Sequence, residues 1–269
     1  MQLAATTQTL EPHTIAADGM AFVRSAVPAD EVEALKAAIE YCREHPGPNF
    51  RTLSREGQPV VQSDLFRWHD VPAIRRLAFE GTLPRLACAA FGTDRVILLE
   101  DQFFYSEQGS GTPSPWHQDE PYHPLEPWFL TIWVPLDPYP ASIGIKAVPG
   151  SHLGDIYAPV EFSAGKATLA AGAFTLEPVP DIDAAPHRFP VVVPDAAPGD
   201  AVLLDSRTLH GAGGRCEATF RRMSIRYAHP DTVYKARPWP VAAFWAPHEV
   251  EQKYGQRIES AAFPIIIPA

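Results

Sequence analysis

The hydrophobic positions divide the chain into a helical first third and a strand-rich remainder. Within residues 27–45, apolar side chains recur at intervals of three and four, which is the period of an amphipathic helix. The recurring positions are Val32, Leu35 and Ile39. Residues 72–92 repeat this pattern, with a break expected between Gly81 and Pro84. We expect both segments to form helices that pack against a sheet.

From Arg95 onward the pattern changes to short runs rich in β-branched and aromatic residues, separated by Pro and Gly. No helix-forming stretch of about ten residues separates these runs, so they do not alternate with helices as in a parallel sheet. The pattern favours a mainly β fold with flanking helices, an antiparallel barrel or jelly roll braced by the N-terminal helices. The runs are residues 95–106, 128–137, 145–151, 200–206 and 219–228.

The chain is expected to form one domain over residues 1–269. Helices support it over about residues 1–94, the β core covers 95–235, and a C-terminal extension covers 236–269. Residues 177–199 are rich in proline, and we expect them to form an ordered but irregular excursion or a lid.

Composition limits the classes of function. The 269 residues include 22 basic and 32 acidic side chains, for a formal net charge of −10. Nucleic-acid binding depends on clustered Lys and Arg, so we expect no nucleic-acid partner. No apolar run approaches the ~20 residues that span a bilayer, which argues against a membrane partner. Three widely spaced cysteines and the lack of a visible secretory signal predict a cytoplasmic protein.

The stretch PWHQDEPYH, residues 115–123, carries the first candidates for metal chemistry. In a strand, residues two apart point to the same face, so His117 and Asp119 are expected to project together. A third ligand is required, and His210 is the best candidate because an apolar strand runs into it and a glycine-rich turn follows. The alternative for His210 is a turn histidine that bonds a backbone carbonyl. The other histidines considered as ligands are His123, His152, His187 and His229.

The strand FRRMSIRYA, residues 220–228, gives an independent clue. Alternation places Arg221 on the same face as the apolar side chains of this strand. We expect that face to turn inward and to bury the Arg221 guanidinium, which then needs an anionic partner. This partner is either a carboxylate side chain or an anionic ligand. The other face, with Arg222 and Arg226, is expected to be solvated.

The motifs HQD at 117–119, His210 in DSRTLHGAGG, and Arg221 eleven residues after His210 resemble a known family. It is the phytanoyl-CoA dioxygenase-like (PhyH-type) branch of the Fe(II)/2-oxoglutarate-dependent oxygenases. The stretches TIWVPLDP at 131–138 and GIKAVPGSH at 144–152 also resemble that family. The resemblance covers about residues 18–235, and the order and spacing of the motifs make it specific.

The resemblance implies a double-stranded β-helix, a cupin-like jelly roll, that holds iron through His117, Asp119 and His210. Such a face of two histidines and one carboxylate leaves three positions open for 2-oxoglutarate and O2. The resemblance also assigns Arg221 to the distal carboxylate of 2-oxoglutarate. The residues that it places along the cosubstrate pocket are Gln102, Thr131 and Trp133, with core packing as the alternative for Trp133. The candidates for substrate contacts are Tyr122, His123 and Trp128.

The predicted function is oxidation of an unactivated C–H bond of a small molecule, with release of succinate and CO2. Halogenating relatives have a small residue in place of the acid, so Asp119 favours hydroxylation or a related oxidation. An acidic chain without a basic patch matches a CoA thioester poorly, and a specialised metabolite or amino-acid derivative is the preferred substrate class. Two alternatives use the same barrel, a cupin-like metal-dependent isomerase and a non-catalytic small-molecule-binding barrel. The sequence does not distinguish a monomer from a homo-oligomer.

Overall fold

The computed structural model describes residues 12–111, 114–161, 168–169, 176–237 and 253–268. Parts of the predicted N-terminal support, residues 1–11, and of the C-terminal extension, residues 238–252 and 269, lie outside the described residues. The α-helices are α1 (Pro12–Asp18), α2 (Ala29–Glu44), α3 (Pro72–Phe79) and α4 (Thr82–Phe91). Short 3-10 helices are η1 (Arg67–His69), η2 (Glu120–Tyr122), η3 (Ala141–Ile143) and η4 (Ser151–Leu153).

The described strands pair in antiparallel fashion. The first group is β1 (Met20–Val23), β2 (Arg51–Thr52), β3 (Val61–Leu65), β4 (Val96–Ser106), β5 (Ser114–His117), β6 (Leu125–Glu126), β7 (Phe129–Pro135) and β8 (Ile145–Ala147). The second group is β9 (Val160–Glu161), β10 (Thr168–Leu169), β11 (Ala201–Asp205), β12 (His210–Ala212), β13 (Phe220–Ala228), β14 (Val233–Tyr234) and β15 (Ile265–Ile266).

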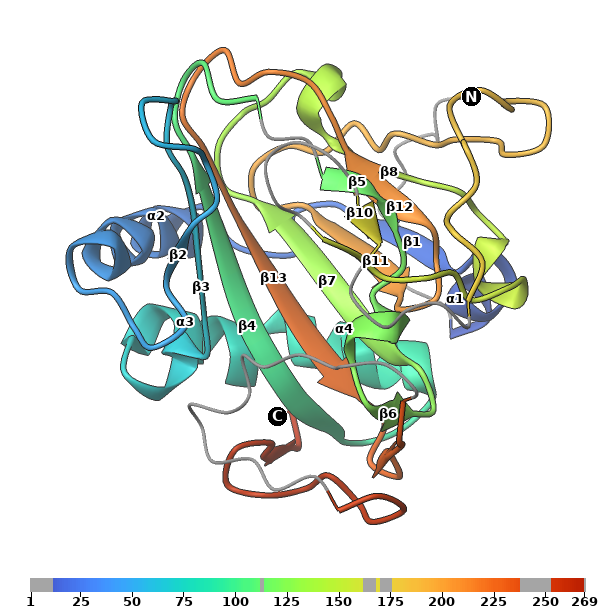
Figure 1. Cartoon of the computed structure of the whole chain (residues 1–269). Coiled ribbons are helices and arrows are strands. Elements are labelled where there is room, and N and C mark those ends of the chain that lie inside the picture. Colours follow the sequence, from blue (N-terminus) through green and yellow to red (C-terminus); the bar gives the residue numbers. More distant parts are fainter. Residues whose placement is uncertain (1–11, 112–113, 162–167, 170–175, 238–252, 269) are drawn as a thin grey trace.

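A large sheet and a small sheet form the β core. The large sheet has the order β1-β11-β7-β13-β4-β3-β2, with β15 paired to β4, and the small sheet has the order β5-β12-β8. Figure 1 shows helices α2, α3 and α4 along one side of the large sheet, with the small sheet on the other. The predicted mainly β jelly roll with bracing helices is therefore confirmed. Among the described residues, no helix has both the length and the apolar character needed to cross a membrane.

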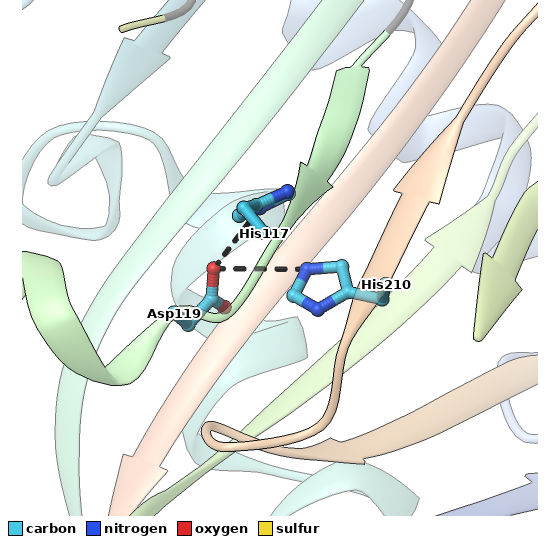
Figure 2. Close-up of side chains that lie close together, drawn as sticks. All are labelled: His117, Asp119 and His210. Carbon is cyan, nitrogen blue, oxygen red and sulfur yellow. Dashed lines mark ion pairs between the residues drawn. The ribbon is translucent and has the colours of Figure 1, made fainter. Parts of the chain in front are cut away.

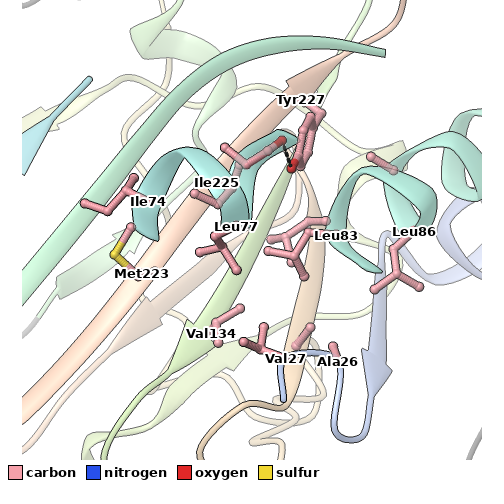
Figure 3. Close-up of a cluster of buried hydrophobic side chains, with 14 of the residues drawn as sticks. Ala26, Val27, Ile74, Leu77, Leu83, Leu86, Val134, Met223, Ile225 and Tyr227 are labelled. Atoms are coloured by element: carbon pink, nitrogen blue, oxygen red, sulfur yellow. Dashed lines mark hydrogen bonds between the residues drawn. The ribbon is translucent and has the colours of Figure 1, made fainter. Parts of the chain in front are cut away.

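The helices cover the outer face of the large sheet because both surfaces are apolar. The predicted helix at 27–45 is α2, and the predicted segment at 72–92 forms α3 and α4, separated at Glu80 and Gly81. Ile74 and Leu77 of α3 belong to the same buried cluster as Ile225 of β13 (Figure 3). The helix side chains in this cluster include Val32, Leu35, Ile39, Ile74, Leu77, Leu83 and Leu86.

The apolar face of β13 therefore points away from the barrel interior, contrary to the sequence-based expectation. Met223, Ile225 and Tyr227 are fully buried against the helices, and the Tyr227 hydroxyl donates to the carbonyl of Ala78 at 2.8 Å. Strand alternation then turns the opposite face, with Ser224, toward the small sheet. Since the sheet buries both faces, an apolar face alone does not identify the interior of the barrel.

The proline-rich segment 177–199 is irregular, as expected, and it covers the outer side of the small sheet. Ile182 and Phe189 form a buried cluster with Val148 and Leu209, against which Trp116 packs. The Trp116 indole donates to Asp183 at 3.1 Å, in the same segment. Trp116 is on the face of β5 opposite His117, so the described part of this segment supports the small sheet from outside.

Packing between α3 and β13 gives the first test. Ile225→Ala is expected to lower the free energy of unfolding by about 2–5 kcal/mol, because it leaves a cavity in a fully buried cluster. Ile267→Ala is the matched control, since that side chain is 71% exposed, and its expected effect is below about 0.5 kcal/mol. Urea denaturation followed by circular dichroism measures both. Equal effects of the two substitutions would contradict the packing described above.

Candidate metal centre

Three candidate ligands meet at the end of the small sheet. His117 is the last residue of β5, His210 is the first residue of β12, and the two are direct partners in the antiparallel register. Asp119 lies two residues beyond β5, immediately before η2, with helical backbone angles. Figure 2 shows the three side chains converging from these elements. The predicted proximity is confirmed, although a turn and not a continued strand brings Asp119 to the site.

The geometry of the three donors fits one metal ion. Asp119 Oδ1 lies 3.5 Å from His117 Nε2 and 3.7 Å from His210 Nε2. All three residues are buried, and one ligand atom from each lies within 4.8 Å of the others. Atoms at these separations can share an ion at bond lengths of about 2.0–2.2 Å. Two imidazoles and one carboxylate on one side of an ion form the facial arrangement typical of non-haem Fe(II).

Backbone carbonyls orient both imidazoles for coordination. His117 Nδ1 lies 2.8 Å from the Pro115 carbonyl, and His210 Nδ1 lies 2.9 Å from the Thr208 carbonyl. A carbonyl accepts a hydrogen bond but cannot donate one, so each Nδ1 carries the hydrogen and each Nε2 is the ring nitrogen available to a metal. Burial, reinforced by neighbouring His117, lowers the pKa of His210 to about 4. At neutral pH this imidazole is therefore in the neutral form that binds a metal.

The two carboxylate oxygens of Asp119 have different neighbours, because Oδ1 faces the two histidines and Oδ2 faces Thr131 and Arg226. Burial opposes its ionisation, but Arg226 and the two histidines outweigh this effect and hold its pKa well below the ordinary value. Oδ2 accepts a hydrogen bond from Thr131 Oγ1 at 2.7 Å and from Arg226 Nε at 3.3 Å. Oδ1 is thereby the oxygen that faces the metal position.

Arg226 lies inside the barrel, and the expectation that it is solvated is wrong. Its side chain is 10% exposed, and its Nη1 contacts Glu100 Oε1 at 2.9 Å and Gln102 Oε1 at 3.1 Å. Gln102 contacts Arg226 and Thr131 contacts Asp119, and their place along the cosubstrate pocket stays a prediction. The sequence signal for this network is the presence of polar residues within otherwise apolar strands, namely Glu100, Gln102 and Thr131.

Arg221 lies on the outer face of the large sheet, so its predicted inward orientation is also wrong. Its guanidinium contacts both carboxylate oxygens of Asp137 at 2.8 Å and Glu40 Oε1 at 3.2 Å, beside α2. The hydrogen bonds that Arg221 donates to Asp137 are the main cause of its raised pKa. Side chains of the protein already supply the anion that the buried guanidinium requires.

Arg222, also expected to be solvated, is on the same inward face of β13 as Arg226. Its Nη1 contacts Ser106 Oγ at 3.0 Å, and its guanidinium lies over the rings of Phe104 and Phe220, at 4.8 and 5.2 Å from their centroids. Within the described part of the chain, no carboxylate forms an ion pair with it. Burial lowers the pKa of Arg222 to about 10. A cation in this position is suited to an anion supplied from outside the chain.

Trp133 and Tyr122 lie close to the site, but in different roles. Trp133 is 6% exposed and packs edge-on against Tyr139 and Phe220 in the apolar part of the barrel interior. The Tyr122 ring lies edge-on to His117, and its hydroxyl bonds both the carbonyl of Val160, at 2.6 Å, and its amide nitrogen, at 2.7 Å. Tyr122 therefore anchors β9 beside the metal motif.

The predicted substrate contacts of His123 and Trp128 are not supported. His123 is 3% exposed, with Nδ1 3.2 Å from the Asp119 carbonyl and Nε2 3.3 Å from Glu100 Oε1. Both ring nitrogens contact the protein, and His123 thereby connects the backbone of Asp119 to Glu100. Trp128 packs against Phe91 of α4, with ring centroids 4.8 Å apart, on the helical side of the large sheet.

The fold and the site define a jelly-roll protein with a metal-binding face of two histidines and one carboxylate. The chain matches the family model for phytanoyl-CoA dioxygenase (PhyH) over residues 15–223. It therefore belongs to this family of oxygenases, as the sequence motifs predicted. A comparison with curated proteins found no match.

Solved structures share the fold. The non-heme α-ketoglutarate-dependent carbocyclase SnoK from nogalamycin biosynthesis aligns with a TM-score of 0.74 and 20% identity, covering 95% of this chain and 94% of SnoK. The epimerase SnoN, in complex with Fe3+, α-ketoglutarate and nogalamycin RO, gives 0.72 and 20%, covering 94% and 96%. EctD from S. alaskensis, in its apoform, gives 0.70 and 18%, covering 100% and 93%.

Titration of His210 gives a test of the site without metal. Because its folded pKa of about 4 lies below the unfolded value near 6.5, the unfolded chain binds more protons between these values. The metal-free protein is therefore expected to lose stability as pH falls through this window, by roughly 2 kcal/mol from pH 6.5 to 5. His210→Gln should remove this part of the dependence, as measured by urea denaturation with a chelator present. The exposed His187→Gln is the control, and an unchanged pH slope in His210→Gln would contradict the assignment.

Proposed function

We propose that the chain is a non-haem Fe(II)/2-oxoglutarate-dependent dioxygenase that oxidises an unactivated C–H bond of a small molecule. In the reaction, one oxygen atom of O2 enters the substrate as a hydroxyl group. The other enters succinate as 2-oxoglutarate loses CO2. The observation that carries this proposal is that two features occur in one barrel. His117, Asp119 and His210 converge, and Arg222 points inward with no carboxylate partner among the described residues.

His117, Asp119 and His210 would hold the iron. Their fit rests on chemistry that the structure displays, because two Nε2 atoms and one carboxylate oxygen converge while their other polar atoms are bonded to the protein. When bound, Fe(II) together with 2-oxoglutarate and O2 supplies the oxidising power for the C–H bond. The side chains of the protein bind, orient and exclude water.

Arg222, in place of the predicted Arg221, would bind the distal carboxylate of 2-oxoglutarate. Its planar guanidinium can donate two parallel hydrogen bonds to a carboxylate, and Ser106 Oγ lies beside it. Arg222 and Arg226 are on the same face of β13, four residues or about 13 Å apart along the strand. A dicarboxylate bound at the metal would therefore extend along β13 toward Arg222. The rings of Phe104 and Phe220 would shield the ion pair from water.

A specialised metabolite or an amino-acid derivative is the substrate class that we propose, acted on in the cytoplasm. SnoK and SnoN belong to nogalamycin biosynthesis, which supports the first of these classes. The described cysteines are unpaired, in keeping with a reducing compartment. Hydroxylation is the proposed outcome, since Asp119 supplies the carboxylate ligand. A carbocyclase and an epimerase share this fold, so placement of the substrate decides the outcome of the oxidation.

Cosubstrate binding is tested by anaerobic addition of Fe(II) and 2-oxoglutarate. The wild-type protein should develop the weak visible charge-transfer band of the chelate, and His210→Ala should abolish it. Arg222→Ala should weaken 2-oxoglutarate binding about 10–100-fold, as expected for the loss of charged hydrogen bonds. Arg221→Ala is the matched control from the same strand and should bind 2-oxoglutarate normally.

Absence of the band in wild-type protein with iron bound would contradict the oxygenase proposal and favour the isomerase or binding-barrel alternatives. Loss of 2-oxoglutarate affinity in Arg221→Ala, with Arg222→Ala unchanged, would restore the assignment made from the sequence.

Turnover is tested with a panel of small molecules by measuring succinate release. A substrate should raise the rate of succinate formation and appear as a product heavier by one oxygen atom in mass spectrometry. Asp119→Ala should release no succinate with the same compound, because a metal site with two histidines alone holds iron weakly. Equal succinate release by Asp119→Ala would show that the reaction does not depend on this site.

A further inference from the structure

Asp119 is enclosed by a ring of buried polar contacts that the choice of metal ligands does not explain. Its Oδ2 contacts Arg226 Nε, and Arg226 Nη1 contacts Glu100 Oε1. Glu100 Oε1 in turn lies 3.3 Å from His123 Nε2, and His123 Nδ1 lies 3.2 Å from the Asp119 carbonyl. The ring thus closes on both the side chain and the backbone of one residue. Each member is 9% exposed or less.

A guanidinium at this position is expensive to bury and needs anionic partners. Arg226 has two, Asp119 Oδ2 at 3.3 Å and Glu100 Oε1 at 2.9 Å. Its orientation is also fixed by Gln102, whose Nε2 donates to Ser63 Oγ, so that its carbonyl oxygen is turned toward Arg226. Another part of the barrel interior is packed with apolar side chains such as Trp133, Val202 and Leu204. Packing of the sheet therefore does not require buried charges. The presence of Arg226 and Glu100 beside Asp119 needs another explanation.

The geometry points to a positioning role: we propose that Arg226, braced by Glu100, restricts Asp119 to coordination through Oδ1 alone. This inference rests on the proposed function. A carboxylate beside a divalent cation can coordinate through one oxygen or through both. Here Oδ2 is engaged by a hydroxyl on Thr131 and by the cation of Arg226, which opposes its approach to a metal ion.

Coordination of Asp119 through one oxygen matters because it determines how many positions on the metal stay open. Three single-atom ligands leave three of six positions open, two for the chelating end of 2-oxoglutarate and one for O2. If Asp119 took a second position, 2-oxoglutarate and O2 would compete for the two that remain. Arg226 would thus preserve the vacancy on which the reaction depends, while touching neither cosubstrate nor substrate. Glu100 would hold Arg226 in place and reduce the net positive charge beside the metal.

Co(II) is a suitable probe, because its visible absorption reports coordination number without turnover. Arg226→Met removes the cation while keeping an unbranched side chain of similar reach. It is expected to shift bound Co(II) to a higher coordination number, because Asp119 can then coordinate through both oxygens. The spectrum of the bound Co(II) should also change, and 2-oxoglutarate should perturb it less than in the wild type. Arg226→Lys should restore only part of the wild-type spectrum, because one ammonium group does not reproduce the two-sided guanidinium contact.

Arg221→Met is the matched control, since Arg221 is a carboxylate-paired arginine on the same strand that faces the helices. It should lower thermal stability while leaving Co(II) affinity and spectrum unchanged, which separates positioning from a general structural role. If Arg226→Met does not fold, Glu100→Gln replaces it. That variant keeps the shape of the side chain, weakens the hold on Arg226, and should shift the Co(II) spectrum in the same direction.

A wild-type Co(II) spectrum in Arg226→Met, or in Glu100→Gln if the former does not fold, would overturn the positioning role. The proposed function would survive that result. Failure of the wild-type protein to bind Co(II) would instead overturn the proposed function, and the positioning role with it. The two failures are thus distinguished by the wild-type titration alone.

Discussion

The burial of one carboxylate, Asp119, determines much of what surrounds it. A charge inside a barrel must be balanced, and Arg226 supplies the opposite charge. The balance requires β13 to turn its arginine-bearing face inward, while the small sheet brings His210 opposite His117 on the other side of the carboxylate. The register of β12 with β5 and the orientation of β13 are thus parts of one electrostatic arrangement.

The large sheet separates two kinds of chemistry because both of its faces are buried. Its outer face is apolar where α3 and α4 cover it, and the few charges near α2 are paired locally, as Arg221 is with Asp137. Its inner face carries the polar residues of the site. Three arginines of β13 consequently have three different environments. Arg221 is paired on the outside, Arg226 is paired with the ligand carboxylate, and Arg222 has its charge available for an external anion.

Membership of the phytanoyl-CoA dioxygenase family and the fold shared with SnoK, SnoN and EctD define a common frame for the metal. These neighbours include a carbocyclase and an epimerase, so the frame does not by itself dictate the product. In this chain the residues flanking the ligands have structural tasks. Tyr122 anchors β9, Gln118 bonds the backbone of residues 155 and 157, and Trp116 bonds the segment that covers the small sheet. Hydrogen bonds from residues before, within and after the HQD motif therefore connect it to residues 155–160 and to Asp183.

The sequence by itself determined the helices, the strand-rich core, the family and the three candidate ligands. Helical and strand periodicities are local, and the HxD motif with its distant histidine is identified by residue type and order. Which face of β13 lies inside was decided only by the tertiary structure. The alternation of side chains along a strand shows which residues share a face. Both faces of this strand are buried, so hydrophobicity could not indicate which of them lies inside the barrel. A shift of one residue exchanges Arg221 for Arg222 on the inner face, and with it the arginine that we propose binds the cosubstrate.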